Sequence, residues 1–434
     1  MIDGVPFNRL HNTGILKSTL FQGWPKECLR QIIYVHLKPG FDVCEHNWQL
    51  NKTDVLKAMF GPGPDRRLAI ETPQEATLDS EKLLDHDTRP KGERALSWLS
   101  AEIRTPVGEA ILRLPGVLSL QLRAWIEEFQ PEVIYSITAS AAMLRLVTKV
   151  AEWRKIPIVP HFTDDWISWL YRDDLFGWWL RPSLLYWFER CLDRSPVRLA
   201  VSRRMADEYT DRYGGTFSVF TNPHEMPLTR PRPAVKPADS PAKLVFVGGL
   251  RPGREKTLLT VARAVSDARK AGVACELDIY SFPEDLTPCQ ETLAANDGVR
   301  VMGWAKPGAV AAILQGADVM VHVESFEKAM IEKTRLSFST KISAYLAAAK
   351  PILVCGPGTL ASCDLVATSG SGISVPKDSV EQVSAAIQSL CLNADLRARL
   401  GDRSWQVAIS EFEAGTVREN FRRNLCYVAA SGAS

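Results

Sequence analysis

The most informative part of the sequence is Phe338-Ser-Thr-Lys-Ile-Ser-Ala-Tyr-Leu-Ala-Ala-Ala-Lys-Pro-Ile-Leu-Val354. A Ser-Thr pair opens an Ala-rich helix, and a buried strand, Pro351–Val354, follows it. Ser339 is a natural N-cap, so the amides of Thr340 and Lys341 should point out of the helix start. Unpaired N–H groups and the helix macrodipole favour an anion at such a position. The stretch therefore predicts a helix that leads into a strand and offers a phosphate site at its start.

Length and composition describe an ordinary globular protein of two or three domains. The chain has 434 residues, of which 46% are hydrophobic and 24% are charged. Its net charge of +2 argues against a protein built mainly to bind nucleic acid, because such proteins usually present a strongly basic face. We therefore expect no nucleic-acid partner.

The cysteines and the N-terminal residues indicate the compartment. Nine cysteines are scattered without a close-spaced pair, which suits a reducing compartment better than a disulfide framework. No apolar run approaches about 18 residues, and Met1-Ile-Asp-Gly-Val-Pro6 lacks the basic and apolar regions of a signal peptide. We expect a cytoplasmic protein that is neither secreted nor membrane-spanning.

Short apolar runs alternate with helix-length amphipathic segments, which is typical of parallel sheets with crossover helices. Helices are expected at Ala141–Arg154, Arg204–Tyr213 and Thr257–Arg269. The expected strands of the first half are Gln31–His36, Glu132–Ile137, Pro157–His161 and Arg198–Ser202. Those of the second half are Lys243–Val247, Cys275–Tyr280, Val299–Met302, Val319–Val323, Pro351–Val354 and Ile373–Val375. The predicted fold class is α/β, with two Rossmann-like doubly wound domains.

A proline-rich segment separates the two halves. Residues 226–241 contain five prolines and no apolar period, so they read as a semi-rigid linker. We expect an N-terminal domain at 1–225 and a C-terminal domain at 242–414. The last helical stretch, Val417–Val428, lies in a segment, 415–434, that should cross back to the first domain. Two such domains face a cleft, and open α/β sheets bind ligands beyond the carboxyl ends of their strands.

The loop after the first strand of the second half suits a diphosphate. Gly248 and Gly249 permit close backbone approach, and the three cations Arg251, Arg254 and Lys256 lie near one turn. The loop is not a Walker loop, since no Gly-Lys-Ser/Thr closes it, and it lacks the full dinucleotide fingerprint. The alternative is a solvated turn that happens to carry charged residues.

Short motifs follow one another along most of the chain in a specific order. They are Pro6-Phe-Asn8, Thr13-Gly-Ile15, Phe21-Gln-Gly-Trp-Pro25, His161-Phe-Thr-Asp-Asp-Trp166, Tyr213-Gly-Gly215, Asn222-Pro223, the Gly248 loop, Ala317-Asp-Val319, His322-Val-Glu-Ser-Phe326 and Ser337-Phe-Ser-Thr-Lys341. Their order and spacing resemble a family-four retaining glycosyltransferase of the GT-B fold, especially those of bacterial surface-polysaccharide assembly.

The resemblance implies a reaction and a donor site. A sugar would pass from a nucleotide diphosphate donor, of UDP or GDP type, to a glycan or lipid-linked glycan acceptor in polysaccharide biosynthesis. The second domain would hold the donor and the first the acceptor, with no metal or other cofactor. Arg254 takes the position of the family's phosphate-binding lysine, and Arg251 or Lys256 would replace an arginine that this chain lacks. Thr340 and Lys341 would hold the diphosphate, whose charge grows as the glycosidic bond breaks.

The chain departs from this family at two glutamates. The family usually has two, eight residues apart, the second contacting the donor ribose, and Leu336 and Ala344 occupy those positions. Glu324 and Glu332 have the same spacing but lie too early before the strand. Glu324 follows a strand end, where it would meet the nucleobase or ribose or else act as a helix-start charge. The departure leaves two alternatives open: a non-catalytic binding or scaffold subunit, and a nucleotide-sugar epimerase on the same fold.

The first half contains the candidate catalytic side chains. His161, Asp164 and Asp165 follow a strand, so they should lie at the cleft edge and hydrogen-bond sugar hydroxyls or assist the acceptor. The alternative is that Asp164 or Asp165 caps the next helix. No cluster of ligands supports a metal at this Asp-Asp pair. A loop containing Gly14 precedes a helix and would approach the donor phosphates or the acceptor, unless it is an ordinary glycine turn.

An aromatic segment suggests a further partner. Between Trp166 and Trp187 the sequence has five tryptophans interleaved with arginines. Such residues can sit at a bilayer interface or grip a lipid-linked acceptor, which would place the protein peripherally at the inner face of the cell membrane. A helix and loop packed against the sheet, or a tryptophan stacked on a sugar ring, are the alternatives.

Overall fold

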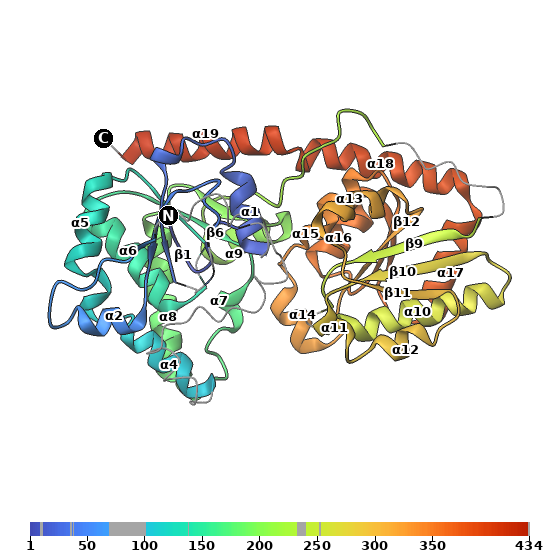
Figure 1. Cartoon of the computed structure of the whole chain (residues 1–434), viewed down its shortest axis with the longest axis horizontal. Helices are drawn as coiled ribbons and strands as arrows, with labels where there is room; N and C mark the ends of the chain where they lie inside the picture. Colours follow the sequence, from blue (N-terminus) through green and yellow to red (C-terminus); the bar gives the residue numbers. More distant parts are fainter. Residues whose placement is uncertain are drawn as a thin grey trace. The chain divides into compact units, whose positions relative to one another are not determined.

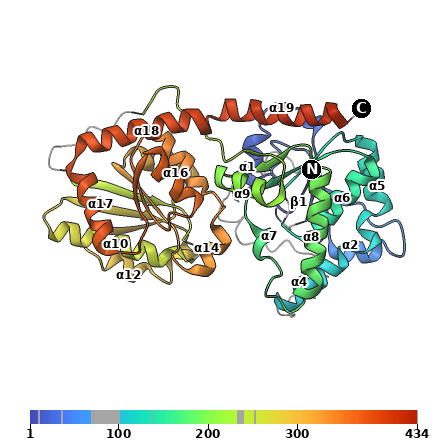
Figure 2. The same cartoon turned by 180° about the vertical axis from the view of Figure 1, so that it is seen from behind.

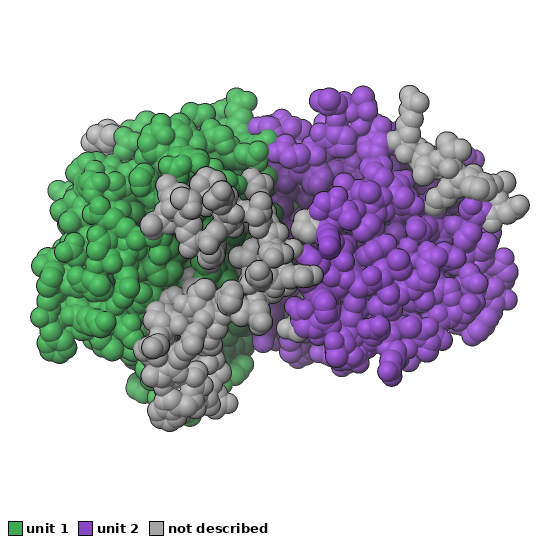
Figure 3. All heavy atoms as spheres, viewed as in Figure 1, with its two compact units in different colours: residues 1–220, 418–434 green, residues 221–417 purple. Residues whose placement is uncertain are grey.

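The computed structural model describes residues 1–8, 12–34, 37, 39–68, 101–137, 139–231, 240–250 and 253–432, without the side chains of 12, 101–105, 307 and 432. Three expectations fall wholly or partly outside these residues: the role of Arg251, the end of the strand Gln31–His36, and half of the segment 226–241. The chain forms two compact units, coloured separately in Figure 3. Unit 1 contains Met1–Phe220 and Arg418–Ser434, and unit 2 contains Thr221–Val417.

In its described residues, unit 1 has two four-stranded sheets. In the first, of order β1-β2-β3-β4, only the last pair is antiparallel; the strands are β1 (Ile2–Asp3), β2 (Arg30–Ile33), β3 (His46–Gln49) and β4 (Arg67–Leu68). The second is parallel throughout, with β5 (Ile134–Ser136), β6 (Ile158–Phe162), β7 (Arg198–Ala200) and β8 (Phe217–Val219) in sequence order. Asp3 connects the two sheets, because its Oδ1 accepts a hydrogen bond of 2.6 Å from the amide of Ile137. The strands expected in the first half are β2, β5, β6 and β7.

Local capping signals fix several helices of unit 1. The Ser140 side chain accepts a hydrogen bond from the Met143 amide and starts α6 (Ala141–Arg154), whose bounds are those expected. Ser202 caps α9 (Arg203–Tyr213) in the same way. Among the described residues of this unit, the other helices are α1 (Asn12–Leu20), α2 (Lys52–Lys57), α4 (Ala101–Ile111), α5 (Leu120–Phe129), α7 (Trp166–Trp169) and α8 (Gly177–Asp193), with 3-10 turns η1 (Lys26–Cys28) and η3 (Pro115–Leu118).

Unit 2 is built on one six-stranded parallel sheet of order β11-β10-β9-β12-β13-β14. Its strands are β9 (Ala242–Val247), β10 (Cys275–Tyr280), β11 (Val299–Gly303), β12 (Val319–Val323), β13 (Ile352–Cys355) and β14 (Gly372–Val375). All six correspond to strands expected from the sequence, and β10 and β12 have the expected bounds. The order is that of a doubly wound nucleotide-binding sheet, so the α/β fold with two Rossmann-like domains is confirmed.

Helices cover both faces of the unit 2 sheet (Figures 1 and 2). Alternate strand residues point to opposite faces: Leu244 and Phe246 pack with one helix layer, whereas Val245 packs with the other. The first layer contains α10 (Arg254–Lys270), α12 (Gln290–Ala294) and α17 (Val380–Leu392). The second contains α13 (Pro307–Gln315), α15 (Thr340–Ala347), α16 (Ala361–Ser369) and α18 (Ala394–Phe412). Two short helices, α11 (Pro283–Leu286) and α14 (Lys328–Thr334), complete the unit.

The last helix, α19 (Ala414–Gly432), begins in unit 2 and ends in unit 1. Phe421 fixes its second part to unit 1, because the ring meets Phe21, Tyr135 and Phe220 at centroid distances of 5.0, 5.5 and 5.6 Å. Such aromatic contacts add to the burial of apolar area. In the described part of the chain, no helix has the length and apolar character needed to cross a membrane.

Candidate functional site

The strand order of unit 2 places one ligand-binding position. In a doubly wound sheet, ligands bind beyond the carboxyl ends of the strands where the order reverses, which here is between β9 and β12. Gly248 directly follows β9, and Glu324 directly follows β12. Residues far apart in the sequence therefore meet at the loop that was expected to hold a diphosphate.

A buried ion pair links the two strand ends. The Arg254 guanidinium lies 2.8 Å from Oε2 of Glu324 through Nη2 and 2.9 Å through Nε. Oε1 of Glu324 lies 2.9 Å from Nε2 of His322. Burial alone would raise the pKa of Glu324, but Arg254 and His322 hold it at about 2. Glu324 is therefore ionised, and Arg254 and His322 each bond one of its carboxylate oxygens.

Lys341 brings a second cation to the same place. It lies in the first turn of α15, its Nζ donates a 3.3 Å hydrogen bond to the carbonyl of Gly249, and it stands 4.7 Å from the centroid of the Phe246 ring. Burial and the neighbouring Arg254 lower the pKa of Lys341 to about 7. The carboxylates of Glu324 and Asp285 act against this shift. Because Nζ forms one hydrogen bond among the described residues, the ammonium form has donors left for a further anion.

Gly248 is required for this arrangement. Its φ is +135°, and a Cβ at this position would lie 2.0 Å from Cε of Lys341. The glycine therefore makes room for the lysine side chain.

Two residues that the sequence analysis did not name hold the loop after β9. Oδ2 of Asp285 accepts a 2.9 Å hydrogen bond from the Leu250 amide, and the Tyr345 hydroxyl bonds both backbone polar atoms of Val247. A search for acidic residues just beyond strand ends would have pointed to Asp285.

The start of α15 has the expected position but not the expected cap. Ser339 occupies the N-cap with extended backbone, yet its side chain caps no helix amide; instead its own amide donates to Oγ of Ser362 at 2.9 Å. The amides of Thr340 and Lys341 belong to the first turn, where no intrahelical acceptor exists. Helix starts of this kind are ready-made anion sites.

Not every predicted donor-site residue gathers there. The Gly249 carbonyl bonds Lys341, as described above. Lys256 points elsewhere: it forms an ion pair with Glu327, and 70% of its side chain is exposed. Arg251 lies outside the described residues.

In unit 1, His161 lies inside the core rather than at an open edge. Its residue exposure is 1%, Nδ1 lies 2.7 Å from the Tyr135 hydroxyl, and Nε2 lies 2.8 Å from the Phe220 carbonyl. Burial lowers the pKa of His161 to about 4, with the Phe220 carbonyl acting against the shift. A neutral ring that donates from Nε2 and accepts at Nδ1 satisfies both contacts and leaves no nitrogen for a substrate.

The two aspartates after β6 have different environments. Asp165 is 1% exposed and accepts hydrogen bonds from the Tyr209 hydroxyl at 2.9 Å, the Arg212 guanidinium at 3.1 Å and the Ser168 hydroxyl at 2.7 Å. It stands at the N-cap position of α7 but does not bond a helix amide. Asp164 is exposed. Of this pair, Asp164 is the carboxylate that a ligand in solution can reach.

Gly14 lies within a helix, which corrects the expected loop. The helix α1 begins at Asn12, so Gly14 falls in its first turn. A Cβ on Gly14 would lie 2.2 Å from Nδ2 of Asn8, and that amide in turn donates to the Pro6 carbonyl at 2.9 Å. The glycine gives space to Asn8 rather than to a ligand.

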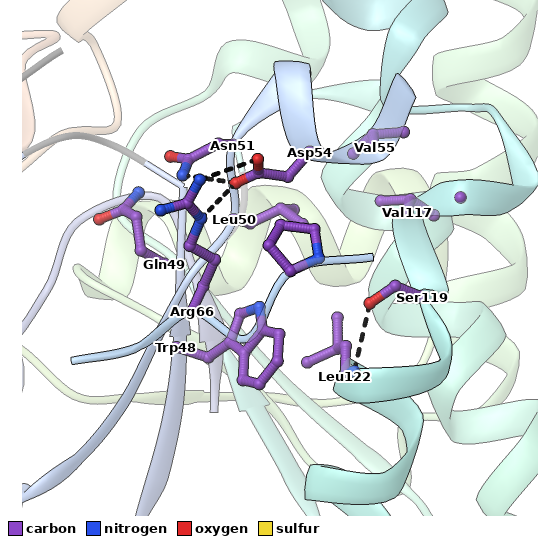
Figure 4. Close-up of a pocket in the computed structure, with 12 residues that line it drawn as sticks. Trp48, Gln49, Leu50, Asn51, Asp54, Val55, Arg66, Val117, Ser119 and Leu122 are labelled. Atoms are coloured by element: carbon purple, nitrogen blue, oxygen red, sulfur yellow. Dashed lines mark hydrogen bonds and ion pairs between the residues drawn. The ribbon is translucent and has the colours of Figure 1, made fainter. Parts of the chain in front are cut away.

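A small pocket lies beyond the carboxyl end of β3 in unit 1 (Figure 4). Among the residues that line the pocket, Arg66 donates two hydrogen bonds to Asp54, of 2.6 and 3.0 Å. The amide oxygen of Asn51 is buried and has no hydrogen-bond partner. Trp48 and Val117 contribute apolar surface. Hydroxyl-rich ligands are recognised by such amide, carboxylate and guanidinium groups.

The aromatic segment is only partly packed. Trp166 is buried, whereas Leu175 and Trp178, around the start of α8, are 70% and 79% exposed, and Tyr186 is 52% exposed. The helix thus combines a packed face with an exposed aromatic one. Among the described residues, no group of three or more His, Cys, Asp or Glu side chains is placed to hold a metal ion.

Two family models match the sequence in succession. Residues 85–223 match the model described as Glycosyltransferase Family 4, and residues 241–393 match the model described as Glycosyl transferases group 1. The second match contains the loop after β9, the end of β12 and the start of α15. No curated protein sequence matches the chain significantly.

Solved structures match over almost the whole chain. A glycosyltransferase from Rickettsia africae is 11% identical, with 98% of this chain and 97% of that chain covered and a TM-score of 0.57. Sucrose-phosphate synthase from Thermosynechococcus elongatus is 12% identical, with 99% and 98% covered and a TM-score of 0.57. HepE from Anabaena, solved with UDP, is 11% identical, with 98% of both chains covered and a TM-score of 0.62. These likenesses show a shared fold.

Proposed function

Because the chain is a glycosyltransferase with the GT-B fold, we propose that it transfers a sugar, with retention and without a metal, from a nucleotide diphosphate donor to a glycan or lipid-linked acceptor. One observation carries the donor assignment: the Lys341 ammonium, with a single 3.3 Å hydrogen bond, stands beside Arg254 at the sheet's ligand-binding position. A diphosphate would accept further hydrogen bonds from this cation.

The proposed catalytic contribution of unit 2 is electrostatic. Negative charge develops on the leaving diphosphate as the glycosidic bond breaks, and only interactions stronger in the transition state speed the reaction. Lys341 and Arg254 supply fixed positive charge, and the α15 amides supply oriented N–H groups. Groups held in place before the reaction need no reorganisation, so the protein's own cations take the part that a metal plays elsewhere.

The donor class and pathway rest on the solved structures. HepE was solved with UDP and with UDP-glucose, which favours a uridine nucleotide sugar here. WaaG, 11% identical with a TM-score of 0.56, is a glycosyltransferase involved in lipopolysaccharide biosynthesis. We extend this to polysaccharide biosynthesis at the cytoplasmic face of a membrane, with Leu175 and Trp178 providing the peripheral contact.

The acceptor is proposed to bind unit 1. Asp164 is exposed after β6 and is the candidate to hydrogen-bond the acceptor hydroxyl. The pocket in Figure 4 offers the unpartnered Asn51 oxygen and the Arg66–Asp54 pair to further hydroxyls. Both positions lie beyond the carboxyl ends of parallel strands, where α/β sheets bind ligands.

A thermal-shift titration tests the donor assignment. Purified protein is titrated with UDP, GDP, ADP and CMP, with Lys341→Met as the site variant and Arg269→Ala, which removes an exposed ion pair in the same unit, as the matched control. Ligand at about 100 times its Kd adds about 2.7 kcal/mol of stability. A shift for one nucleotide that Lys341→Met loses and Arg269→Ala keeps supports the assignment. No shift with any nucleotide contradicts it.

Nucleotide release then separates the proposed activity from its two alternatives. With the matching nucleotide sugar, release that depends on added glycan acceptor supports a transferase. Interconversion of the sugar without acceptor indicates an epimerase instead. Binding without either reaction indicates a binding or scaffold subunit, the alternative favoured by Ala344, which lacks the usual ribose-contacting carboxylate.

A further inference from the structure

A group of exposed apolar side chains lies at the end of α2 in unit 1. Phe60 is 95% exposed, Leu56 and Met59 are each 42% exposed, and Leu120, the first residue of α5, is 67% exposed. We call these four residues the apolar tip. Apolar side chains exposed singly are ordinary on a protein surface, whereas a group of them in one place is typical of a contact site.

Backbone hydrogen bonds hold the α2 part of the apolar tip in place. The chain keeps turning beyond the end of α2, because the Met59 amide donates to the Leu56 carbonyl at 3.2 Å. The Phe60 amide likewise donates to the Lys57 carbonyl at 3.1 Å. Phe60 is therefore presented to solvent by an ordered backbone, which reduces the entropy cost of placing its ring in a contact.

The turn that follows α2 brings Leu120 to the same surface. The Gln121 amide donates to the Pro62 carbonyl at 3.4 Å. Gly63 has a φ of +79°, and a Cβ at this position would lie 2.9 Å from Cβ of Ser119, so glycine allows the turn to approach the start of α5. The apolar tip is consequently one surface built from two helices.

The charge around the apolar tip is positive. Residues 52–68 contain four cations and two carboxylates. The two arginines of this segment pair with Asp54 at 2.6 Å and with Asp65 at 3.4 Å. Lys57 exposes 68% of its side chain and lies 4.0 Å from Asp54, so most of this cation meets solvent. A cation beside exposed apolar side chains complements a layer that is both anionic and apolar.

The segment that leads into α5 also connects the apolar tip to α8. Gly116, in η3, packs so closely on α2 that a Cβ would lie 2.2 Å from the Val55 carbonyl oxygen. Arg113, just before η3, stands 4.4 Å from the ring of Trp179, which is next to the exposed Trp178. Figures 1 and 2 both show α2, α4 and α8 in the same part of unit 1. The apolar tip and the contact proposed at α8 thus flank one short segment.

We propose that the apolar tip enters the interfacial layer of an anionic membrane, with the Phe60 ring at the edge of the acyl chains and Lys57 at the lipid phosphates. This is a second contact, distinct from the one at α8, and it rests on the membrane location given in the proposed function. A bilayer suits so small a surface, because each inserted apolar side chain and each cation near the lipid phosphates adds to the binding.

A protein partner suits the apolar tip less well. A large side chain exposes at most about 250 Å². At that size, the four exposed fractions together offer less than the about 800 Å² that each partner contributes to a stable protein–protein interface. The available area therefore favours the membrane over a second copy of this chain.

Co-sedimentation of the full chain with lipid vesicles tests the proposal. One set of vesicles is phosphatidylcholine, and the other is an equal mixture of phosphatidylcholine and phosphatidylglycerol. We expect binding to the mixture that falls about tenfold in Phe60→Ser and about fivefold in Lys57→Gln. The effect of Lys57→Gln should be absent on phosphatidylcholine alone. Leu392→Ser is the matched control, because Leu392 is 72% exposed in unit 2.

The variant Trp178→Ser separates this proposal from the contact at α8. Unchanged binding in Phe60→Ser overturns the apolar tip, and a loss in Trp178→Ser alone leaves the α8 contact standing. An equal loss in Leu392→Ser and Phe60→Ser also overturns the proposal, because binding would then not depend on this surface. If the wild type binds neither vesicle, both membrane contacts fail, whereas nucleotide release measured without vesicles still tests sugar transfer.

Oligomeric state and fold complete the test. Sedimentation velocity without vesicles should give the same mass for wild type and Phe60→Ser, and a dimer that Phe60→Ser dissociates would assign the apolar tip to a second copy and overturn the proposal. Thermal unfolding of Phe60→Ser should match the wild type, because the side chain is exposed. Phe60→Trp should retain vesicle binding, since an indole also favours the membrane interface.

Discussion

Nε of Arg254 lies 2.9 Å from Oε2 of Glu324, although the two residues belong to different strand-to-helix connections of unit 2. The pair keeps a guanidinium charge in place at the ligand-binding position before any ligand arrives. The carboxylate of Glu324 is buried, so Arg254 stabilises the folded protein by balancing this charge. Arg254 is also a candidate to bind the ligand. Experiments on this pair must therefore separate stability from binding.

Arg254→Ala should weaken nucleoside diphosphate binding by at least about tenfold and destabilise the ligand-free protein by about 3 kcal/mol. The destabilisation arises because a buried carboxylate loses its cation. Arg254→Ala/Glu324→Ala should recover most of the stability and none of the affinity. Urea unfolding and calorimetry measure the two effects. Recovery of affinity in the double variant would show that Arg254 acts only through Glu324.

Nucleoside diphosphate binding should take up a proton near pH 8. The pKa of Lys341 is about 7 in the ligand-free protein, so the group is mostly neutral at pH 8, and a bound diphosphate favours its charged form. Affinity should consequently fall as the pH rises above 7. Calorimetric titrations in two buffers of different ionisation enthalpy measure the number of protons taken up per bound nucleotide. Lys341→Met should abolish the uptake, and an equal uptake in that variant would assign the proton elsewhere.

Ala344→Glu should tighten the binding of the matching donor. Ala344 is on α15, three residues after Lys341, at the position where the resembling family has its ribose-contacting glutamate. A restored carboxylate offers a charge-assisted hydrogen bond to ribose hydroxyls, about 1.5–3 kcal/mol. The measurement is the Kd for the nucleotide that gives the thermal shift, with Ala344→Gln as the uncharged control. Weaker binding in Ala344→Glu would mean that the pocket has been reshaped around alanine.

His161→Gln should change the acid stability of the protein. The pKa of His161 is about 4 when folded and about 6.5 when unfolded. Its neutral form therefore favours folding fully above pH 6.5, and up to about 3 kcal/mol of this contribution is lost as the pH falls toward 4. Unfolding free energies at pH 7 and pH 4.5 should differ less in the variant than in the wild type. An unchanged difference would exclude His161 as the titrating group.

Asp164→Asn should lower the transfer rate without lowering the thermal stability. Asp164 is exposed, and substitutions at exposed positions usually change stability by less than about 0.5 kcal/mol. Asp165→Asn is the informative contrast, because Asp165 accepts hydrogen bonds from Tyr209, Arg212 and Ser168 in the interior and its substitution should reduce stability. Equal transfer rates in Asp164→Asn and wild type would remove Asp164 from the site.

The elements of this protein could be predicted because their signals are local. Apolar runs bounded by turn residues gave β10 and β12 their expected bounds, and the helix predicted over Ala141–Arg154 has the bounds of α6. Lys341 and Arg254 were named from the sequence because cations next to a glycine loop and a helix start have a recognisable chemistry, and their role in donor binding stays a prediction. Gly14 was misplaced because a glycine in the first turn of a helix and a glycine in a preceding loop leave the same local pattern.

Hydrophobic periodicity acts over a few residues, so the amino-acid sequence alone was enough to predict two α/β halves, the six strands of the second and four strands of the first. Which residues share a site depends on the tertiary fold. The strand order brought Glu324 beside Arg254, and Gly248 opened the space for Lys341. It also buried His161 between Tyr135 and the Phe220 carbonyl. These relationships depend on strand pairing and on burial between segments that are distant in the sequence. A local sequence pattern does not encode the free energy of such contacts.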